Sequence, residues 1–166
     1  MEPSGRRGAA ILFATAAGAY LLDRLSKVWA EHTLQGHPVV VIKGVLTLQF
    51  TTNSGGAFSL GQSAPWIFAG FTIGVSVLIV ATAFRHRSTL TSVALGLVLG
   101  GALGNLTDRI VRAPGMRGRV VDFIDFHIWP VFNLADSAVV IGALLLGWAA
   151  LRSDHAGADV TSARDG

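Results

Sequence analysis

The sequence predicts an all-α membrane protein with a small β element, built on four membrane-spanning helices. Of its 166 residues, 51% are hydrophobic and 14% are charged, whereas soluble domains carry about 25% charged residues. Three long stretches contain no Asp, Glu, Lys or Arg: residues 44–84, 88–107 and 137–151. One segment alternates apolar and polar residues in the manner of a β-strand. This composition argues against a soluble globule and excludes a disordered chain, and the lack of Cys excludes a disulfide-stapled domain.

Four apolar segments meet or approach the roughly 20 residues that a helix needs to cross a bilayer. Each is too apolar all round for a soluble helix with one wet face. Four spans place both ends of the chain on the same side of the membrane. The segments are residues 9–30, 66–84, 90–106 and 131–151.

The first span has an alternative interpretation as a cleavable signal peptide, because Arg6 and Arg7 precede it. Charged residues follow it directly at Asp23 and Arg24, and the small residues at 17–19 lie inside the apolar run. Both features favour a retained span. Lys and Arg divide six against seven between the two sides, so the positive-inside rule does not orient the chain.

The chain is predicted to form one integral membrane domain over residues 9–152. The polar tails 1–8 and 153–166 are predicted to be disordered. Small residues recur every four positions inside the third span, which predicts a helix face that another backbone approaches closely. They are Gly96, Gly100 and Gly104.

The segment between the first and second spans has a strand pattern. Apolar and polar side chains alternate over residues 45–52. Residues 39–42 are β-branched and are predicted to pair with this strand around a turn at 43–44. The Asn-Ser-Gly-Gly run at 53–56 then ends the strand. We expect a small amphipathic sheet at the membrane surface.

Five acidic residues lie at or near the ends of the predicted spans, where a charge costs about 2.5–3.5 kcal/mol and so marks a functional hypothesis. They are Asp23, Asp108, Asp122, Asp125 and Asp136. Asp23 and Lys27 have the spacing of a local ion pair, with a structural and a functional interpretation equally open. Asn105, Asp108 and Arg109 share a helical face, on which Arg109 either neutralises Asp108 or clamps a substrate carbonyl or lipid phosphate. The structural interpretation is favoured there, because a paired carboxylate loses its free proton chemistry.

Asp122 and Asp136 have apolar neighbours instead. Burial raises the pKa of a carboxyl, and two carboxyls brought together share one proton. One then activates water while the other donates to a carbonyl oxygen, which hydrolyses a peptide bond without metal, Ser or Cys. Asn133, on the same helical face as Asp136, can orient that carboxylate. Asp125 is a competing candidate, and spacing alone does not bring any of these groups together.

Other chemistries have less support. The sequence contains no His-Glu-x-x-His, Gly-x-Ser-x-Gly, phosphate-loop or Rossmann pattern. A metal site would need more ligands than Asp122, Asp125, His127 and Asp136 supply, so no metal or cofactor is expected. The net charge of +3 comes without a basic run with interleaved aromatics, so no nucleic-acid partner is expected. A proton-coupled transporter, a binding scaffold and a metal-dependent hydrolase are the rival interpretations.

Five polar motifs follow one another along the chain. They are Asp23-Arg24-Leu25-Ser26-Lys27, Asn53-Ser54-Gly55-Gly56-Ala57-Phe58, Gly104-Asn105-Leu106-Thr107-Asp108-Arg109, Val121-Asp122-Phe123 and Phe132-Asn133-Leu134-Ala135-Asp136-Ser137. Together with four spans, they resemble the lipoprotein signal peptidase family, also called signal peptidase II, over roughly residues 9 to 150. Two departures are visible. Ser26 stands where the family usually has Thr, and the stretch 110–119 is longer and 127–131 shorter than usual, which leaves the shape of the cover over the site open.

The resemblance implies an aspartic endopeptidase with four transmembrane helices and an extracytoplasmic β-cradle between helices 1 and 2. Its substrates are prolipoproteins whose Cys carries diacylglycerol, and it removes the signal peptide by cutting just before that Cys. The implied catalytic dyad is Asp122 and Asp136, with water as the nucleophile. The implied substrate-binding or supporting residues are Asp23, Lys27, Asn53, Asn105, Asp108, Arg109, Asn133 and Ala135.

The resemblance also implies a location and partners. The protein would lie in the bacterial cytoplasmic membrane, with both termini cytoplasmic and the active site near the outer leaflet. Membrane lipids and globomycin-type inhibitors are the further partners implied, and no cofactor is. We expect the substrate to lie extended beside the strand at 45–52, by β-augmentation, with Asn53 holding a substrate carbonyl.

Overall fold

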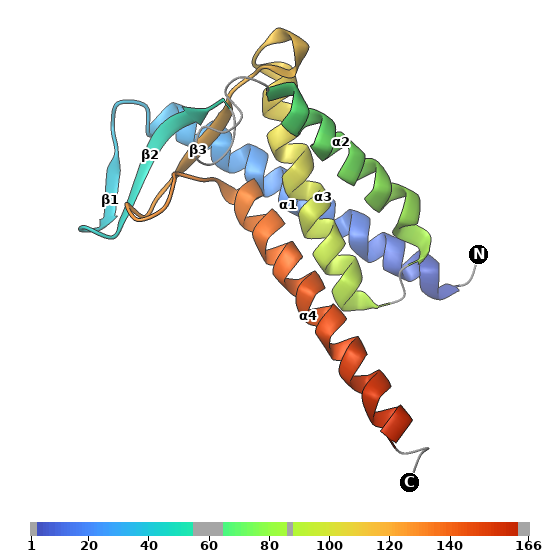
Figure 1. Cartoon of the computed structure of the whole chain (residues 1–166). Coiled ribbons are helices and arrows are strands. Elements are labelled where there is room, and N and C mark those ends of the chain that lie inside the picture. Colours follow the sequence, from blue (N-terminus) through green and yellow to red (C-terminus); the bar gives the residue numbers. More distant parts are fainter. Residues whose placement is uncertain (1–2, 55–64, 86–87, 163–166) are drawn as a thin grey trace.

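The computed structural model describes residues 3–54, 65–85 and 88–162, which form a helical bundle with one small sheet at its end (Figure 1). The main helices are α1 (Pro3–Thr33), α2 (Pro65–Thr82), α3 (Thr89–Val111) and α4 (Leu134–Ser162). Ser88 caps the start of α3, because its side chain accepts from Thr91 N–H. Two short 3-10 turns, η2 (Ala83–Arg85) and η3 (Pro114–Met116), follow α2 and α3.

Three helices in the described part of the chain are long and apolar enough to cross a membrane. They cover Gly5–Thr33, Thr89–Val111 and Leu134–Arg152. The remaining predicted span, residues 66–84, coincides with α2 and η2, which together form a shorter apolar helix over Ala69–Arg85. The outer faces of the helices carry exposed apolar side chains such as Phe71 and Leu144, as expected for surfaces that contact lipid rather than water.

The sheet has the order β1-β2-β3 and is antiparallel throughout. β1 (Val39–Ile42) and β2 (Leu46–Asn53) form the hairpin that the sequence predicts, to within one residue. Val45 N–H donates to Ile42 C=O across the turn, and Gly44 has a φ of 75°, which favours glycine. Of the predicted break at 53–56, residues 55–56 lie outside the described residues.

The third strand, β3 (Val120–Asp125), corrects the expectation that the cradle arises between helices 1 and 2 alone. It precedes α4 in the chain and pairs with β2 from Thr47 to Asn53. β2 is therefore the central strand, paired with β1 over residues 46–48 and with β3 from Thr47 to Asn53. Because β1 pairs only with the first three residues of β2, pairing of a substrate with the rest of that edge stays a prediction.

Helices α1 and α4 extend into the two segments predicted to be tails. α1 begins at Pro3, and proline is favoured in the first helical turn because its φ suits the helix. Gly5 lies against the Phe84 carbonyl of η2, so this turn is packed rather than loose. At the other end the α4 backbone stays helical to Ser162, over a stretch that contains no proline.

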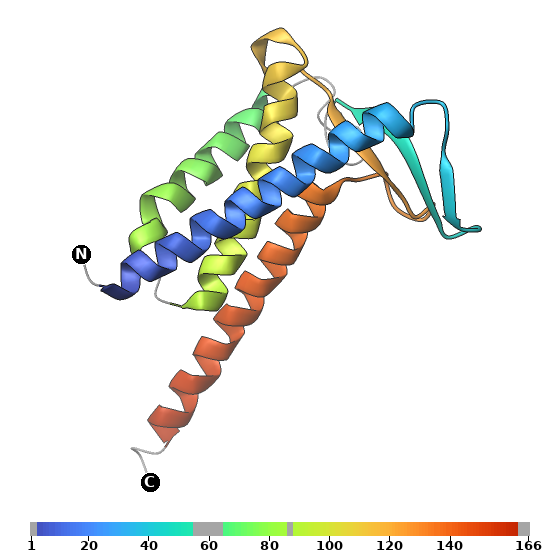
Figure 2. The ribbon, with the colours of Figure 1, turned by 180° about the vertical axis from the view of Figure 1, so that it is seen from behind.

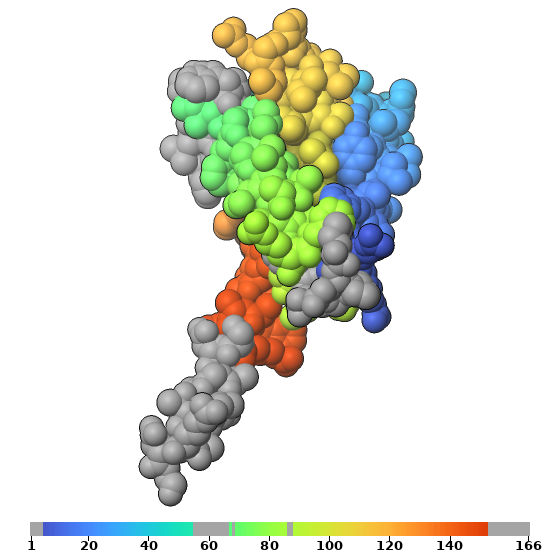
Figure 3. Space-filling model, turned by 90° about the vertical axis from the view of Figure 1, so that its right-hand side faces the viewer, coloured from blue at the N-terminus to red at the C-terminus, as the bar shows by residue number. Residues whose placement is uncertain are grey.

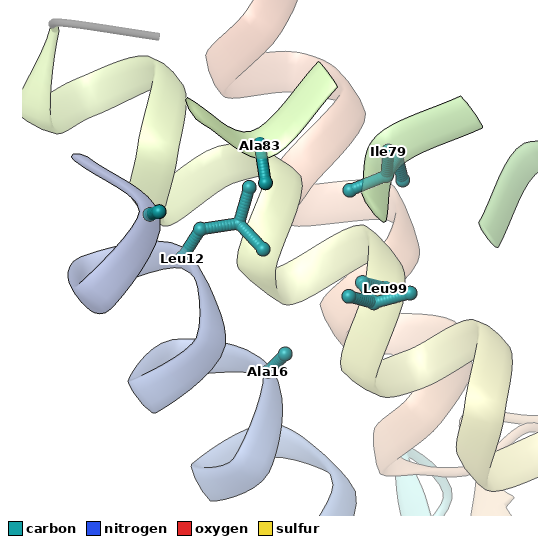
Figure 4. Close-up of a cluster of buried hydrophobic side chains, with 6 residues drawn as sticks. Leu12, Ala16, Ile79, Ala83 and Leu99 are labelled. Carbon is teal, nitrogen blue, oxygen red and sulfur yellow. The ribbon is translucent and has the colours of Figure 1, made fainter. Parts of the chain in front are cut away.

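α3 is the central helix and packs against α1, α2 and α4. Its glycine face lies against α1, as predicted: a Cβ at Gly96 would lie 2.6 Å from the Leu12 carbonyl oxygen. A buried apolar cluster joins α1, α2, η2 and α3 (Figure 4). The first turn of α1 and the last turn of α4 lie away from the sheet (Figure 2), and α4 extends past the other helices there (Figure 3).

Candidate active site

A cavity of about 250 Å³ lies where the sheet meets the helices. β2, α3, β3, the following loop and α4 all contribute to its wall. Its polar lining is Asn53, Asn105, Arg109, Asp122 and Asp136, and its apolar lining includes Val120, Trp129, Pro130, Val131, Phe132 and Val140. The two aspartates predicted to form a catalytic pair therefore reach one cavity from separate elements.

Asp136 lies in the first turn of α4, where a reciprocal cap fixes its position. Asp136 N–H donates to Asn133 Oδ1 at 2.9 Å, and Asn133 N–H donates to Asp136 Oδ2 at 3.3 Å. This is the capping-box arrangement, with Asn133 before the helix and Asp136 three residues later. The expectation that Asn133 orients the Asp136 carboxylate agrees with these contacts.

Asp122 lies in β3 and is joined to Asp136 through Asn133. Asn133 Nδ2 donates to Asp122 Oδ1 at 2.6 Å, and Asn133 is itself fully buried. Burial raises the pKa of Asp122 from 3.8 to about 7, and the neighbouring charge of Asp136 adds to the rise. Hydrogen bonds from Asn133 and Asn53 and the charge of Lys27 act in the opposite direction. Asp122 therefore keeps its proton to a much higher pH than an exposed aspartate does.

α3 supplies two further groups to the cavity. Asn105 Nδ2 donates to Asp136 Oδ1 at 2.8 Å. Arg109 Nη1 donates to the Asn105 carbonyl at 3.2 Å, and within the described residues its buried Nε has no hydrogen-bond partner. Arg109 lines the cavity, and the carboxylates whose charges act on it are Asp136, Asp122 and Asp108, in decreasing order. It is placed to donate to a ligand in the cavity.

Asp125 does not belong to this cavity. It lies three residues after Asp122 on the same strand, and an odd separation places two side chains on opposite faces. Its carboxylate accepts from Gln49 Nε2 and His127 N–H, and the His127 ring lies 3.3 Å from it. The four residues weighed as metal ligands therefore do not converge, because Asp125 and His127 lie apart from the cavity.

Asp23, Lys27 and Asp108 are fully buried behind the cavity, between α1 and α3. Lys27 Nζ lies 2.8 Å from Asp23 Oδ2, which is the predicted local ion pair. It also lies 3.0 Å from Asp108 Oδ2. Ala135, buried at the start of α4, donates its N–H to Asp23 Oδ1 at 3.0 Å. These four residues therefore do not line the cavity but connect the elements that carry its aspartates.

The sequence analysis missed the apolar wall and three ion-pair partners. Trp129 and Phe132 line both this cavity and a second, apolar one of about 500 Å³ beside α4. Arg24 and Arg112 both pair with Asp108, and Arg112 also pairs with Glu31. The i,i+4 spacing of Asp108 and Arg112 was a readable signal. The contacts with α1 had none, because they join residues distant in the sequence.

Comparison with known proteins places the chain in a family. The family described as "Signal peptidase (SPase) II" matches residues 15–152. A lipoprotein signal peptidase of Streptomyces coelicolor is 47% identical over 144 residues, which cover 86% of this chain and 71% of that protein. One from Rhodococcus jostii is 42% identical over 147 residues, which cover 87% of this chain and 74% of that protein.

Solved structures agree with these relatives. One, described as a bacterial membrane enzyme, has a TM-score of 0.75 and 29% identity, covering 86% of this chain and 88% of that chain. A second with the same description has a TM-score of 0.73 and 30% identity, covering 84% and 92%. The resemblance inferred from the five motifs is thus confirmed, and the chain belongs to the signal peptidase II family of lipoprotein signal peptidases.

Proposed function

We propose that this chain removes the signal peptide from diacylglyceryl-modified prolipoproteins by cutting just before the lipid-bearing Cys, with Asp122 and Asp136 as the catalytic dyad. The observation that carries the assignment of the dyad is their convergence. Two aspartates from β3 and α4 line one cavity and are bridged by the buried side chain of Asn133. Family membership supports the reaction, and this convergence supports the residues.

The proton starts on Asp122. Its pKa of about 7 means that it holds a proton in a large share of molecules at neutral pH, and the negative charge of Asp136 contributes to that retention. Asp136 is then the base that takes a proton from water. As the water attacks the scissile carbonyl carbon, Asp122 donates its proton to the carbonyl oxygen, and a neutral tetrahedral diol results.

The diol collapses by the reverse movement of protons. Asp122 takes a proton from one hydroxyl as the carbonyl re-forms, and Asp136 gives its proton to the departing nitrogen as the C–N bond breaks. The products are the carboxyl end of the signal peptide and the free amino group of the lipidated Cys. Both aspartates recover their starting states, and no covalent intermediate forms.

Two cavity residues are placed to hold the substrate backbone. Asn53 ends β2 opposite Val120 and lines the cavity beside Asp122. The guanidinium of Arg109 lines it from α3. Both offer donors to substrate carbonyl oxygens, where developing negative charge gains most from a fixed donor. Globomycin-type peptide antibiotics would compete for the same cavity.

The proposed setting is the bacterial cytoplasmic membrane, crossed four times, with α2 as the fourth span. The ends of α1 and α4 that lie away from the sheet would face the cytoplasm, and the sheet and cavity would lie near the outer leaflet (Figure 1). Trp29 and Trp129 are about half exposed at the sheet end, where aromatic side chains commonly mark a membrane interface.

The proposal is tested by incubating purified protein with a diacylglyceryl-modified precursor and following signal-peptide loss by gel shift. Asp122→Asn and Asp136→Asn should each lower the cleavage rate by at least about 10³-fold, because either change removes one half of the proton relay. Both variants should still accumulate as folded protein. Normal cleavage by either variant would contradict the assignment.

The matched control is Asp125→Asn, which makes the same change on the same strand outside the cavity. It should cut the precursor at close to the unaltered rate. The rival interpretations predict different results. A transporter predicts substrate-dependent proton flux in vesicles, a scaffold predicts no effect of either dyad variant, and a metal-dependent hydrolase predicts loss of activity on chelation with recovery on adding a divalent ion.

A further inference from the structure

Lys27 is a fully buried cation with three polar partners, and it does not itself line the cavity. Its ammonium group lies 2.8 Å from Asp23 Oδ2 and 3.0 Å from Asp108 Oδ2, and it donates to Asn105 Oδ1 at 2.8 Å. An ammonium has three N–H donors, so these contacts can use all of them. A buried charge of this kind is costly unless fully paired.

Each partner of Lys27 leads in one further contact to the dyad. Asp23 Oδ1 accepts from the N–H of Ala135, the residue before Asp136. Asp108 Oδ2 accepts at 3.3 Å from the N–H of Val121, the residue before Asp122.

The third route runs through Asn105. Its Nδ2 donates directly to Asp136 Oδ1, and its Oδ1 accepts from Asn133 Nδ2 at 3.2 Å. One ammonium group therefore holds both catalytic strand and catalytic helix at the residue next to each aspartate.

The side chains around the Lys27 ammonium group are closely packed. Gly104 of α3 faces the Asp23 carboxylate so closely that a Cβ there would overlap it. Asp108 is shared with Arg24 and Arg112, both of which reach it from more exposed positions. Displacing a reacting group by about 1 Å can lower the rate of catalysis by about 10²-fold. Lys27, held through Asp23 and Asp108 at the residue before each catalytic aspartate, would prevent such displacements.

The charge of Lys27 also acts on the dyad. Burial is the main cause of the raised pKa of Asp122, and Asp136 of α4 raises it further, whereas Lys27 of α1 lowers it. Arg109 of α3 faces the same carboxylates, and the side chains of Asn53 and Asn133 hydrogen-bond with Asp122. Removing the ammonium should therefore raise the pH at which Asp122 loses its proton.

We propose that Lys27 is a positioning residue for the reaction, which sets the separation of Asp122 and Asp136 through Asp23, Asp108 and Asn105. This inference rests on the proposed function. It predicts that loss of Lys27 affects kcat rather than KM, because Lys27 contacts the dyad's supports and not the substrate.

The test compares steady-state cleavage of a diacylglyceryl-modified precursor by purified full-length variants. Lys27→Met should lower kcat by about 10²-fold with little change in KM, and should move the alkaline limb of the pH profile to higher pH. Arg24→Met is the matched control. It removes another cation from Asp108, which keeps Lys27 and Arg112 as partners, so kcat and the alkaline limb should stay in place.

Lys27→Met leaves the buried carboxylates of Asp23 and Asp108 without their shared cation, and the variant could lose activity by misfolding. A second, charge-balanced variant separates a loss of folding from a loss of positioning. Asp23→Asn/Lys27→Met removes one charge of each sign, and the side-chain oxygen at position 23 still accepts from Ala135 N–H. A folded variant with unaltered kcat and pH limb would overturn the proposal. So would failure of both variants to fold, since Lys27 would then serve stability alone. An unaltered protein that leaves the precursor uncut would count against the proposed function instead.

Discussion

Burial sets the proton affinity of Asp122, which is only 2% exposed. Its pKa rises from 3.8 to about 7, chiefly by desolvation, so the folded protein holds this proton more tightly than the unfolded chain does. The stability that results is fully present below about pH 4 and is lost as the pH rises through 7. A change of this size corresponds to about 4 kcal/mol of unfolding free energy. Asp122, the proposed general acid, thus lowers the free energy of unfolding at alkaline pH.

Asp122→Asn should therefore stabilise the protein while abolishing cleavage. Near pH 8 the neutral amide avoids the cost of a buried charge, and its oxygen still accepts from Asn133 Nδ2, so the thermal midpoint in detergent should rise by several degrees. Near pH 4 the unaltered protein is already protonated at this position, and the two midpoints should agree. An equal gain at both pH values would mean that another cause is responsible.

Among the elements, α3 is the helix that packs against all three other main helices and also supplies residues to the site. One face presents glycines to α1, the opposite face receives α4, and its last turns supply Asn105, Asp108 and Arg109 to the site. Gly100 lies so close to the Ala16 carbonyl of α1 that a Cβ would overlap it. The close approach of these two helices places Lys27 within reach of Asn105 and Asp108.

Gly100→Ala should destabilise the protein by about 1–3 kcal/mol, because the added methyl group meets backbone that cannot move aside easily. Gly147→Ala is the matched control. It makes the same change in α4 with no atom within 4 Å of the new Cβ, and alanine favours the helix by about 1 kcal/mol over glycine. Thermal midpoints in detergent should therefore fall for the first variant and hold or rise for the second. Equal midpoints would contradict close packing at Gly100.

The parts of the fold that follow from local pattern were predictable from the sequence. The hairpin of β1 and β2 shows alternation and a glycine turn, and the glycine face of α3 shows a four-residue repeat. β3 lacks such a signal, because a strand buried on both faces has no alternation of apolar and polar residues. The identities of Asp122 and Asp136 were accessible through the motifs. Their convergence was not, since it depends on pairing between β2 and β3 and on the bridge through Asn133.

At the scale of the whole molecule, the sheet and the ends of the longest helices lie at opposite ends of the bundle. The sheet and the cavity lie at one end of the bundle, and the first turn of α1 and the last of α4 lie toward the other (Figures 1 and 2). The orientation proposed above requires an even number of crossings, with α2 as the fourth span. The exposed turn of the β1–β2 hairpin should then be accessible from outside the cell.

The chain contains no Cys, so single cysteines report topology without background labelling. Lys43→Cys lies in the exposed hairpin turn, and Arg152→Cys lies on the exposed surface of α4 far from the sheet. A membrane-impermeant maleimide added to intact spheroplasts should label the first and not the second, and lysis should make both reactive. Labelling of Arg152→Cys before lysis would contradict the proposed orientation.

The buried ion pairs join helices that are synthesised at different times. Lys27 pairs with Asp23 within α1, and Asp23 accepts from the amide of Ala135 at the start of α4, which is made after α1. On the proposed mechanism, proteolytic competence is therefore acquired only when α4 meets α1. A nascent or prematurely terminated chain without α4 lacks Asp136, so on the proposed mechanism it should not cleave a precursor.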